Sequence, residues 1–392
     1  MNQSKYAALV HVPKFHQFNV LGLTTIERTL IALAKAGVSD ACVLTDEAEA
    51  LRAFLGKNVW DIRLHFFQKN EMEAARQKVV ELQPQAVFVF NEPLAVDISV
   101  LQDLMKTQEG GANTGTLGGE VVLLQLADFQ SDGKRAPIEP MIVGNRSCHP
   151  VRSEEELQSV KQRMIKNLTK PTDGWASRYL NRPISTRISR VLVYTSITPN
   201  QFTFITGLLA FIPVYFVLKG GYWNWLIGAA IYHLASVLDG VDGEIARMKM
   251  LHSKFGQWLD TIFDFASMVA VLIALVISVQ KPELGQPFYI QKAGWVALGA
   301  AVGAILSIVI YNIRYKREGT FYIPYAYLSS ESRWAKALAK INNIGKRDFY
   351  IFLFLLLAVV GMFPFALVYI AVMAILVFLL SIQTHFTKPA TS

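Results

Sequence analysis

Long apolar segments dominate the second half of this 392-residue chain and constrain its fold more than any other feature. An α-helix needs about 20 apolar residues to cross the roughly 30 Å of hydrocarbon in a bilayer. We predict six membrane-spanning helices, at residues 202–218, 223–243, 258–279, 293–313, 347–362 and 363–383. The last two are divided at Gly361-Met-Phe-Pro364, a turn signal. Five spans remain the alternative.

Charge divides the chain into two chemically different halves. Residues 1–150 contain 14 Lys and Arg against 17 Asp and Glu, whereas residues 151–392 contain 24 against 13. The chain is 52% hydrophobic and 17% charged, which excludes disordered and fibrous classes. Its two cysteines, Cys42 and Cys148, fit a reducing compartment. We expect three parts: a cytoplasmic domain at 1–165, a juxtamembrane amphipathic linker at 166–200 and a membrane domain at 201–392.

Basic residues concentrate in loops on one side of the predicted bundle. Three lie in the loop at 247–256 and eight in the loop at 314–347, against Lys219, Lys281 and Lys292 on the other side. The positive-inside rule then places both termini of a multi-pass protein on the cytoplasmic side of the cell membrane. Such a rim also attracts anionic membrane lipid. Because the basic residues flank spans, we expect no nucleic-acid partner.

The segment before the first span has the pattern of a helix lying in the headgroup plane. Apolar residues recur at near-helical spacing between Trp175 and Leu192, with arginines between them. Pro183 is expected to divide this segment into two pieces. The alternative is a soluble linker helix.

Five acidic residues are packed into 26 positions at the end of the second predicted span and the start of the third. No other acid occurs within residues 174–282. Asp239 and Asp242 share one helix face, and Asp260 and Asp264 share one face of the next helix. The cluster comprises Asp239, Asp242, Glu244, Asp260 and Asp264.

A hairpin through residues 248–256 would bring the two pairs of aspartates together. Acids at membrane depth are costly unless they are paired, metal-bound or facing water. Four like charges in a poorly solvated site repel strongly, so a cation must lie among them. Hard oxygen ligands suit Mg²⁺ or Mn²⁺, and their density indicates two ions.

Small residues beside the acids favour phosphate chemistry. Gly243 and Ala246 leave space for a flat base or a pyrophosphate to approach the backbone, and Arg247 adds a cation. Gly256 permits a close approach where the third span begins. Two alternatives remain: structural ion pairs with basic residues of the 247–256 loop, and a cation-transport pathway.

This pattern resembles a known family. The run Asp239-Gly-Val-Asp242-Gly243-Glu-Ile-Ala246-Arg247, followed after eight residues by Gly256-Gln-Trp-Leu-Asp260-Thr-Ile-Phe-Asp264, is similar to the signature of CDP-alcohol phosphotransferases. The likeness covers roughly residues 171–385 and includes Thr198-Pro199-Asn200. It implies a six-helix membrane enzyme, usually a homodimer, in which an alcohol acceptor displaces CMP from a CDP-linked donor.

The resemblance also implies a role for each motif residue. Asp239, Asp242 and Asp260 would hold two metal ions, and Asp264 would act as general base while also touching a metal. The nucleotide and its phosphates would lie at Asn200, Gly243, Ala246, Arg247 and Gly256.

The acceptor alcohol and the donor's other half stay open. Arg314, Lys316 and Arg317 could bind a phosphate on the acceptor or donor, because arginine forks suit phosphate. An anchoring role on the cytoplasmic side is the equal alternative. The donor could be CDP-diacylglycerol or a CDP-polyol, in phospholipid or inositol-phosphate-type synthesis.

The first half alternates strand and helix patterns, which predicts an α/β domain with a mostly parallel sheet. The expected strands are residues 7–12, 41–44, 62–67, 86–90 and 120–126. The expected helices are residues 24–36, 47–54, 71–82 and 98–106. Ligands of such sheets lie beyond the carboxyl ends of the strands.

Residues 21–38 resemble the first helix of sugar-phosphate nucleotidyltransferases, which in some organisms are fused to a CDP-alcohol phosphotransferase. In those fusions the soluble half makes CDP-inositol and the membrane half consumes it. Here the loop His11–Asn19 lacks glycine, and Asn91-Glu92 stands where a metal-binding aspartate belongs. We therefore expect a vestigial or regulatory domain. The alternatives are a bifunctional enzyme that makes its own CDP-alcohol and an inactive membrane-anchored binding protein.

Overall fold

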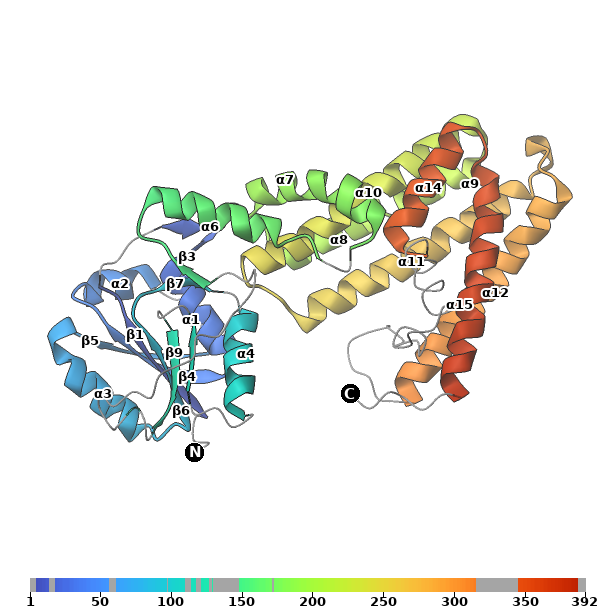
Figure 1. The fold of residues 1–392 in the computed structure, drawn as a ribbon. Helices are drawn as coiled ribbons and strands as arrows, with labels where there is room; N and C mark the ends of the chain where they lie inside the picture. The colour runs from blue at the N-terminus through green and yellow to red at the C-terminus, as the bar shows by residue number, and fades with distance from the viewer. Residues whose placement is uncertain are drawn as a thin grey trace. The chain divides into compact units, whose positions relative to one another are not determined.

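A computed structural model of the protein describes two compact units. The residues described are 5–13, 18–55, 61–96, 98–109, 114–117, 121–126, 129, 148–170, 173–314 and 345–386. The first unit comprises Met1–Leu168 with Met248–Met250, and the second comprises Thr169–Arg247 with Leu251–Ser392. The first is an α/β unit and the second is helical (Figure 1).

The first unit is built on a mixed sheet. Within the described residues, six strands lie in the order β5-β4-β1-β6-β9-β8. The first four are parallel to their neighbours, and β9 and β8 add an antiparallel edge. The mostly parallel sheet predicted from the sequence is therefore confirmed. The strands are β1 (Tyr6–His11), β4 (Val38–Leu44), β5 (Arg63–Phe67), β6 (Ala86–Phe90), β8 (Thr114–Leu117) and β9 (Val121–Gln125).

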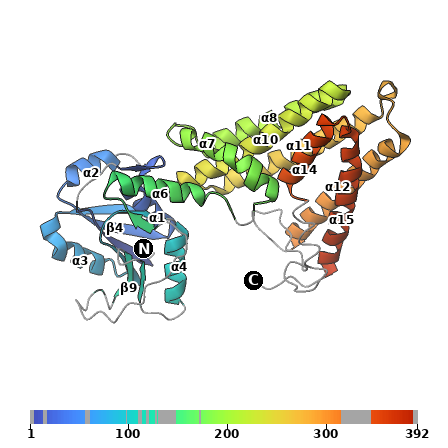
Figure 2. The same ribbon diagram turned by 45° about the horizontal axis from the view of Figure 1, so that its top comes forward.

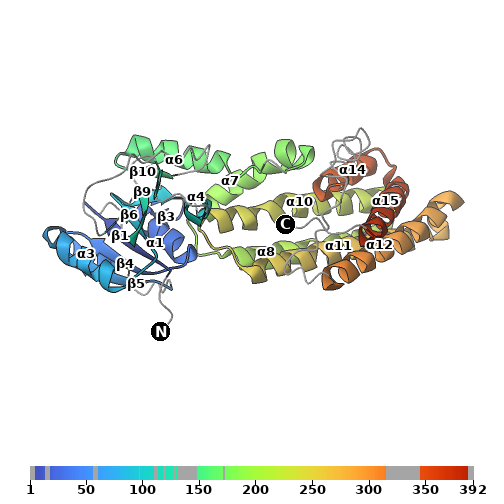
Figure 3. The same ribbon diagram turned by 60° about the horizontal axis from the view of Figure 1, so that its bottom comes forward.

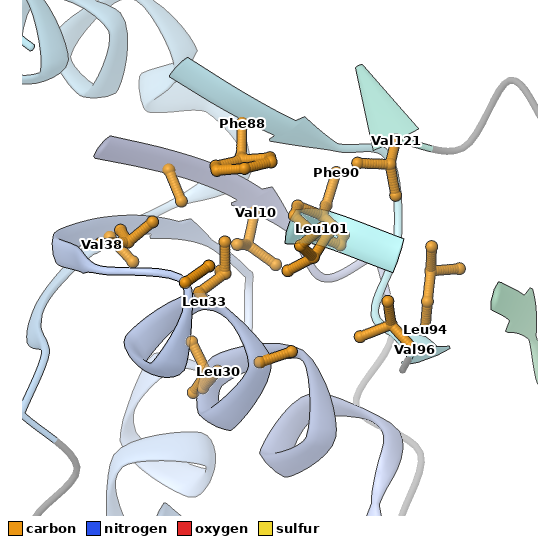
Figure 4. Packing of buried hydrophobic residues seen from close by; sticks show 14 of the residues in the cluster. Val10, Leu30, Leu33, Val38, Phe88, Phe90, Leu94, Val96, Leu101 and Val121 are labelled. Carbon is orange, nitrogen blue, oxygen red and sulfur yellow. The ribbon is translucent and has the colours of Figure 1, made fainter. Parts of the chain in front are cut away.

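Helices cover both faces of this sheet, because side chains alternate along each buried strand. Ala8 and Val10 of β1 pack with residues of α1, α2 and α4. Figure 4 shows Val10 with Leu30 and Leu33 of α1 and with Leu101 of α4. Ala7 and Leu9 pack on the other face, with residues of α3. The helices are α1 (Thr25–Lys35), α2 (Ala48–Leu55), α3 (Met72–Glu81) and α4 (Ile98–Glu109), each close to its predicted range.

Several short elements were not predicted, because two or three residues carry no readable periodicity. Two small antiparallel pairs, β2 with β3 and β7 with β10, flank the main sheet. A helix, α6, follows them and begins at Ser153, whose hydroxyl accepts a hydrogen bond from the Glu156 amide. These elements are β2 (Asn19–Val20), β3 (Leu23–Thr24), β7 (Leu94–Val96), β10 (Cys148–Pro150) and α6 (Glu154–Lys166).

The second unit is helical, and each predicted span coincides with helix in the structure. The first predicted span is broken near Ala210 into α8 and α9, and a turn at Gly361 separates the last two as expected. Pro183 lies in the first turn of α7, where its missing N–H costs little. The helices are α7 (Arg182–Leu192), α8 (Pro199–Leu209), α9 (Ile212–Lys219), α10 (Tyr222–Met248), α11 (Lys254–Val279), α12 (Phe288–Arg314), α14 (Arg347–Val359) and α15 (Ala366–Phe386).

Four described segments are long and apolar enough to cross a bilayer, which indicates a membrane protein. They are Pro199–Lys219, Lys254–Val279, Phe288–Tyr311 and Phe363–Gln383. Helix α14 has 13 residues, or about 20 Å of helix, and α10 carries three of the five clustered acids. The six-span arrangement and the orientation of the termini therefore stay predictions.

Glycines set the close approach of neighbouring helices in this unit. Helices α8 and α11 lie side by side (Figure 3), and a Cβ at Gly207 of α8 would lie 2.4 Å from the ring of Phe263 on α11. Helices α12 and α15 lie side by side (Figure 2), and a Cβ at Gly303 would lie 3.1 Å from the Phe378 ring. Small residues let helix backbones approach closely where water supplies no driving force.

Replacing Gly207 with alanine is expected to loosen the contact between α8 and α11. The added methyl group has no space beside Phe263, and overpacking of this kind costs typically about 1–3 kcal/mol. We expect the midpoint of thermal unfolding in detergent to fall by several degrees. Gly299→Ala is the matched control, since nothing lies within 4 Å of the point that its added Cβ would occupy. Equal midpoints for the two variants would contradict this packing argument.

Candidate functional site

The acidic cluster is built by the hairpin of α10 and α11. Asp239 and Asp242 lie near the end of α10, and Asp260 and Asp264 lie in the first half of α11. Helix α11 begins after Ser253, whose hydroxyl accepts a hydrogen bond from the Gly256 amide at 2.9 Å. The two aspartates of α10 are three residues apart and those of α11 are four apart. Each pair therefore lies on one face of its helix, as the sequence predicts.

Three of the four aspartates converge. One carboxylate oxygen from each of Asp239, Asp260 and Asp264 lies within 4.8 Å of the others. The three residues are half-buried, and the carboxylates of Asp239 and Asp264 retain about a third of their exposure. The hairpin therefore pools acids from two helices, close enough for one cation to contact all three.

Asp242 lies beside this group rather than within it. Its side chain is buried, and the hydroxyl of Thr203 on α8 donates a hydrogen bond to it. The Gly243 amide donates a second. The structure thus shows three pooled carboxylates and a fourth, Asp242, that is held by α8, and the roles predicted for these four aspartates stay predictions. Thr203 lies outside the motif that drew attention to this site.

Arg347 supplies the cation that the sequence analysis did not identify. Its guanidinium donates a hydrogen bond to Asp239 at 3.2 Å and forms an ion pair with Asp264. Arg347 is the first residue of α14, where the helix dipole disfavours a positive charge. A basic residue at the start of the predicted span 347–362 is a signal that the sequence itself carries.

Glu244 has a different environment from the aspartates. Its carboxylate is fully buried and accepts hydrogen bonds from Arg182, Ser185 and Ser189 of α7. The ion pairs seen at the acidic cluster therefore involve Arg182 and Arg347. Neither arginine belongs to the 247–256 loop, to which the ion-pair alternative assigned the basic partners.

The small residues of the motif permit close approaches. A Cβ at Gly256 would lie 2.5 Å from Oδ1 of Asn200, so glycine lets the start of α8 meet the start of α11. At Gly243 the nearest neighbour of an added Cβ is the Arg247 guanidinium, at 3.6 Å. The structure thus brings Asn200 of α8 to Gly256 of α11, and Arg247 to Gly243 on α10.

The other candidate residues lie apart or outside the described chain. Ala246 is buried on α10. Arg314 is exposed at the end of α12, whereas Lys316 and Arg317 lie outside the described residues. The acceptor-phosphate site proposed for these three residues is therefore untested.

The donor set suits a divalent cation. Carboxylate oxygens are the ligands that Mg²⁺ and Mn²⁺ prefer, and three are already close enough to share an ion. Together with Asp242, these acids form a set of four carboxyl groups, and the arginines named beside them in the described residues are Arg347 and Arg247. The site therefore has both the ligand type and the excess negative charge that such an ion requires.

In the first unit, the carboxyl ends of the central strands carry few chemically active groups among the described residues. Asn91 and Glu92 follow β6, as expected, and Glu92 pairs with Arg152. Nδ1 of His11 lies 3.2 Å from the Asn91 carbonyl oxygen. Residues 14–17 of the glycine-free loop lie outside the described residues.

Sequence comparison identifies the helical unit. Residues 196–380 match the family of CDP-alcohol phosphatidyltransferases, and this match contains all four aspartates. The chain carries a CDP-alcohol phosphatidyltransferase domain. The resemblance inferred from the aspartate motif is thereby confirmed.

Three relatives illustrate the likeness. A bifunctional IPC transferase and DIPP synthase of Aquifex aeolicus is 31% identical over 257 residues, 65% of this chain and 54% of that protein. The protein of the same name from Thermococcus kodakarensis is 32% identical over 57% of this chain and 46% of its own length. An archaetidylinositol phosphate synthase of Pyrococcus horikoshii is 34% identical over 23% and 47%, respectively. The chain spans about half the length of the curated relatives it matches.

Thr203→Val should weaken metal binding without disturbing the packing of α8. Valine has the shape of threonine but cannot donate to Asp242, and residues that orient metal ligands typically contribute about 10–100-fold in affinity. Titration with Mn²⁺, followed by electron paramagnetic resonance, measures this change. Thr206→Val is the matched control, because that hydroxyl bonds only backbone carbonyls among the described residues. Unchanged Mn²⁺ affinity in Thr203→Val would contradict the orienting role.

Proposed function

We propose that the helical unit transfers a substituted phosphate from a CDP-linked donor to an alcohol acceptor and releases CMP. The observation that carries this proposal is the convergence of Asp239, Asp260 and Asp264 within the matched domain. Asp242, held by Thr203, completes the acidic set. Two divalent ions bound there would neutralise the donor's diphosphate and the departing nucleotide.

The chain's own residues bind the donor and activate the acceptor. Gly243 and Ala246 offer space along α10 for the cytidine, with Asn200 and Gly256 at the adjoining helix starts. Arg247 and Arg347 provide guanidinium forks for phosphate oxygens. Asp264 is the proposed base for the acceptor hydroxyl proton. The Asp264 carboxylate is paired with Arg347, so the acceptor hydroxyl would have to reach it beside that guanidinium.

Asp260→Asn should abolish metal-dependent CMP release while leaving the protein folded. Asparagine keeps the shape of the side chain but removes one of the three pooled charges. CMP release from CDP-diacylglycerol and CDP-inositol, with Mn²⁺ or Mg²⁺, is the measurement. Glu283→Gln, at the opposite end of α11, serves as the control.

Two results would argue for other functions. Nucleotide-independent Mn²⁺ flux into liposomes would favour cation transport. A folded wild-type protein that releases no CMP from either donor would favour an inactive binding protein.

An apolar cavity beside the aspartates supports a lipid-linked substrate. The cavity has a volume of about 200 Å³ and lies among α10, α11, α12, α14 and α15. Phe265, next to Asp264, lines it, and so does Gly345, two residues before Arg347. Tyr232 also lines it, with a buried hydroxyl that lies near Ser267 and Arg347.

The apolar side chains that line the cavity suit the hydrocarbon chain of a lipid. The polar headgroup of the same lipid would then lie at the aspartates. A CDP-polyol has no apolar part that would fill such a space, whereas one chain of a lipid substrate would. Tyr232 would then meet the first oxygen atoms of that lipid, where the chain joins the headgroup. We therefore propose that the donor or acceptor is a membrane lipid, which places the reaction in phospholipid synthesis.

Ala304→Phe should separate the two donor classes. Ala304 of α12 is buried and lines the cavity, so a phenyl ring there would occupy the space of a lipid chain. We expect CMP release from CDP-diacylglycerol to fall at least tenfold. Val302→Phe, on an exposed face of the same helix, should change little. A protein that uses CDP-inositol alone and is unaffected by Ala304→Phe would contradict the lipid assignment.

We propose that the first unit is a vestigial or regulatory nucleotidyltransferase-like domain. The ion pair between Glu92 and Arg152 supports a non-catalytic role. Glu92 stands where a metal-binding aspartate belongs, and its carboxylate is already bound by Arg152. The bifunctional alternative requires pyrophosphate release from CTP and a polyol phosphate by the full chain.

Both termini are proposed to face the cytoplasm, in a homodimer within the cell membrane.

A further inference from the structure

Glu244 lies on a face of α10 that carries none of the four motif aspartates. It is nevertheless the most completely buried acidic residue of this helix. Glu244 is 0% exposed. Gly240 lies one turn before it on the same face, about 100° around the helix from Asp239 and about 160° from Asp242. A Cβ at Gly240 would lie 3.3 Å from the Arg182 guanidinium, so glycine allows α7 to pack closely here.

Helix α7 provides every hydrogen bond that the described residues make to the Glu244 carboxylate. Arg182 donates from Nη1 at 2.5 Å, and Ser185 donates at 2.7 Å, both to Oε1. Ser189 donates to Oε2 at 2.6 Å. The two serines are four residues apart, fully buried, and lie on one face of α7. A buried carboxylate with three directed donors is fixed in both position and orientation.

Arg182 is itself held on its other side. Its Nε and Nη2 donate to the two oxygens of Asp173 at 2.8 and 3.2 Å. The Arg182 and Asp173 side chains are only 11% and 10% exposed. An arginine gripped bidentately by one acid has little freedom to move, so it presents a fixed point to Glu244.

The opposite face of α7 is exposed and amphipathic. Ile184 and Val191 are exposed there, together with Arg187 and Arg190. Apolar and basic side chains on one helix face suit the headgroup layer of a membrane. Helix α7 therefore joins a surface suited to lipid headgroups with a polar face that is locked to α10.

We propose that Glu244 and Arg182 are positioning residues that fix the rotation of α10 about its axis and so set Asp239 and Asp242 against the aspartates of α11. This inference rests on the proposed function in that the four aspartates bind divalent ions. The rotation of α10 matters because Asp239 and Asp242 lie on one face of this helix. That face is directed toward α11 at only one rotational orientation of α10. A hydrophobic contact would allow small rotations, whereas three directed hydrogen bonds to one carboxylate do not.

Glu244→Gln in the full-length protein tests this inference. Glutamine preserves the shape and can still bond both serines, but it removes the charge that holds Arg182. We expect the Mn²⁺ dissociation constant of the folded, monodisperse variant to rise at least tenfold, measured by electron paramagnetic resonance. CMP release should then recover at high Mn²⁺, because the aspartates themselves are intact. Arg190→Gln, on the exposed face of α7, is the matched control and should bind Mn²⁺ as the wild type does.

A milder variant keeps the test decisive if Glu244→Gln does not fold. Ser189→Ala removes one neutral donor and should raise the Mn²⁺ dissociation constant severalfold, whereas Arg182→Lys should preserve part of the affinity through its charge. Wild-type Mn²⁺ affinity in folded Glu244→Gln or Ser189→Ala would overturn the positioning role. Failure of the wild type to bind Mn²⁺ would instead overturn the proposed function itself, so the two failures are distinguishable.

Discussion

The helical unit depends on contacts that offset the electrostatic repulsion among its clustered carboxylates, which the fold places where water is scarce. Five acids lie on two adjoining helix ends, and each needs a positive charge or a set of donors nearby. The structure meets this demand for four of the five acids in three separate ways. Thr203 and a backbone amide hold Asp242, Arg347 bridges Asp239 and Asp264, and Arg182 with two serines holds Glu244.

These solutions come from three different helices, and that arrangement explains how the site is built. Helix α8 reaches Asp242, α14 reaches the pooled aspartates, and α7 reaches Glu244. The hairpin of α10 and α11 supplies the charges, and the surrounding helices orient them. The close approaches at Gly207, Gly240 and Gly256 are part of the same design, because larger side chains there would push the orienting helices away.

Local patterns predicted much of this molecule, and long-range contacts account for what they did not predict. The central strands and the acidic motif were found because alternation and helical spacing lie within a few consecutive residues. Thr203 and Arg347 could not be assigned in that way, since they meet the acids only after helices distant in sequence have packed. The break between α8 and α9 and the short strands likewise follow from packing. The separation of Asp242 from the other aspartates is a tertiary effect of the same kind.

Arg347 also bears on how such a protein matures. A guanidinium that already lies between two acids acts as a counter-ion encoded in the chain itself. It lowers the self-repulsion of the hairpin during insertion and assembly, before any ion from solution is present. The helical unit therefore contains within its own sequence part of the positive charge that its clustered acids require, independently of any ion from solution.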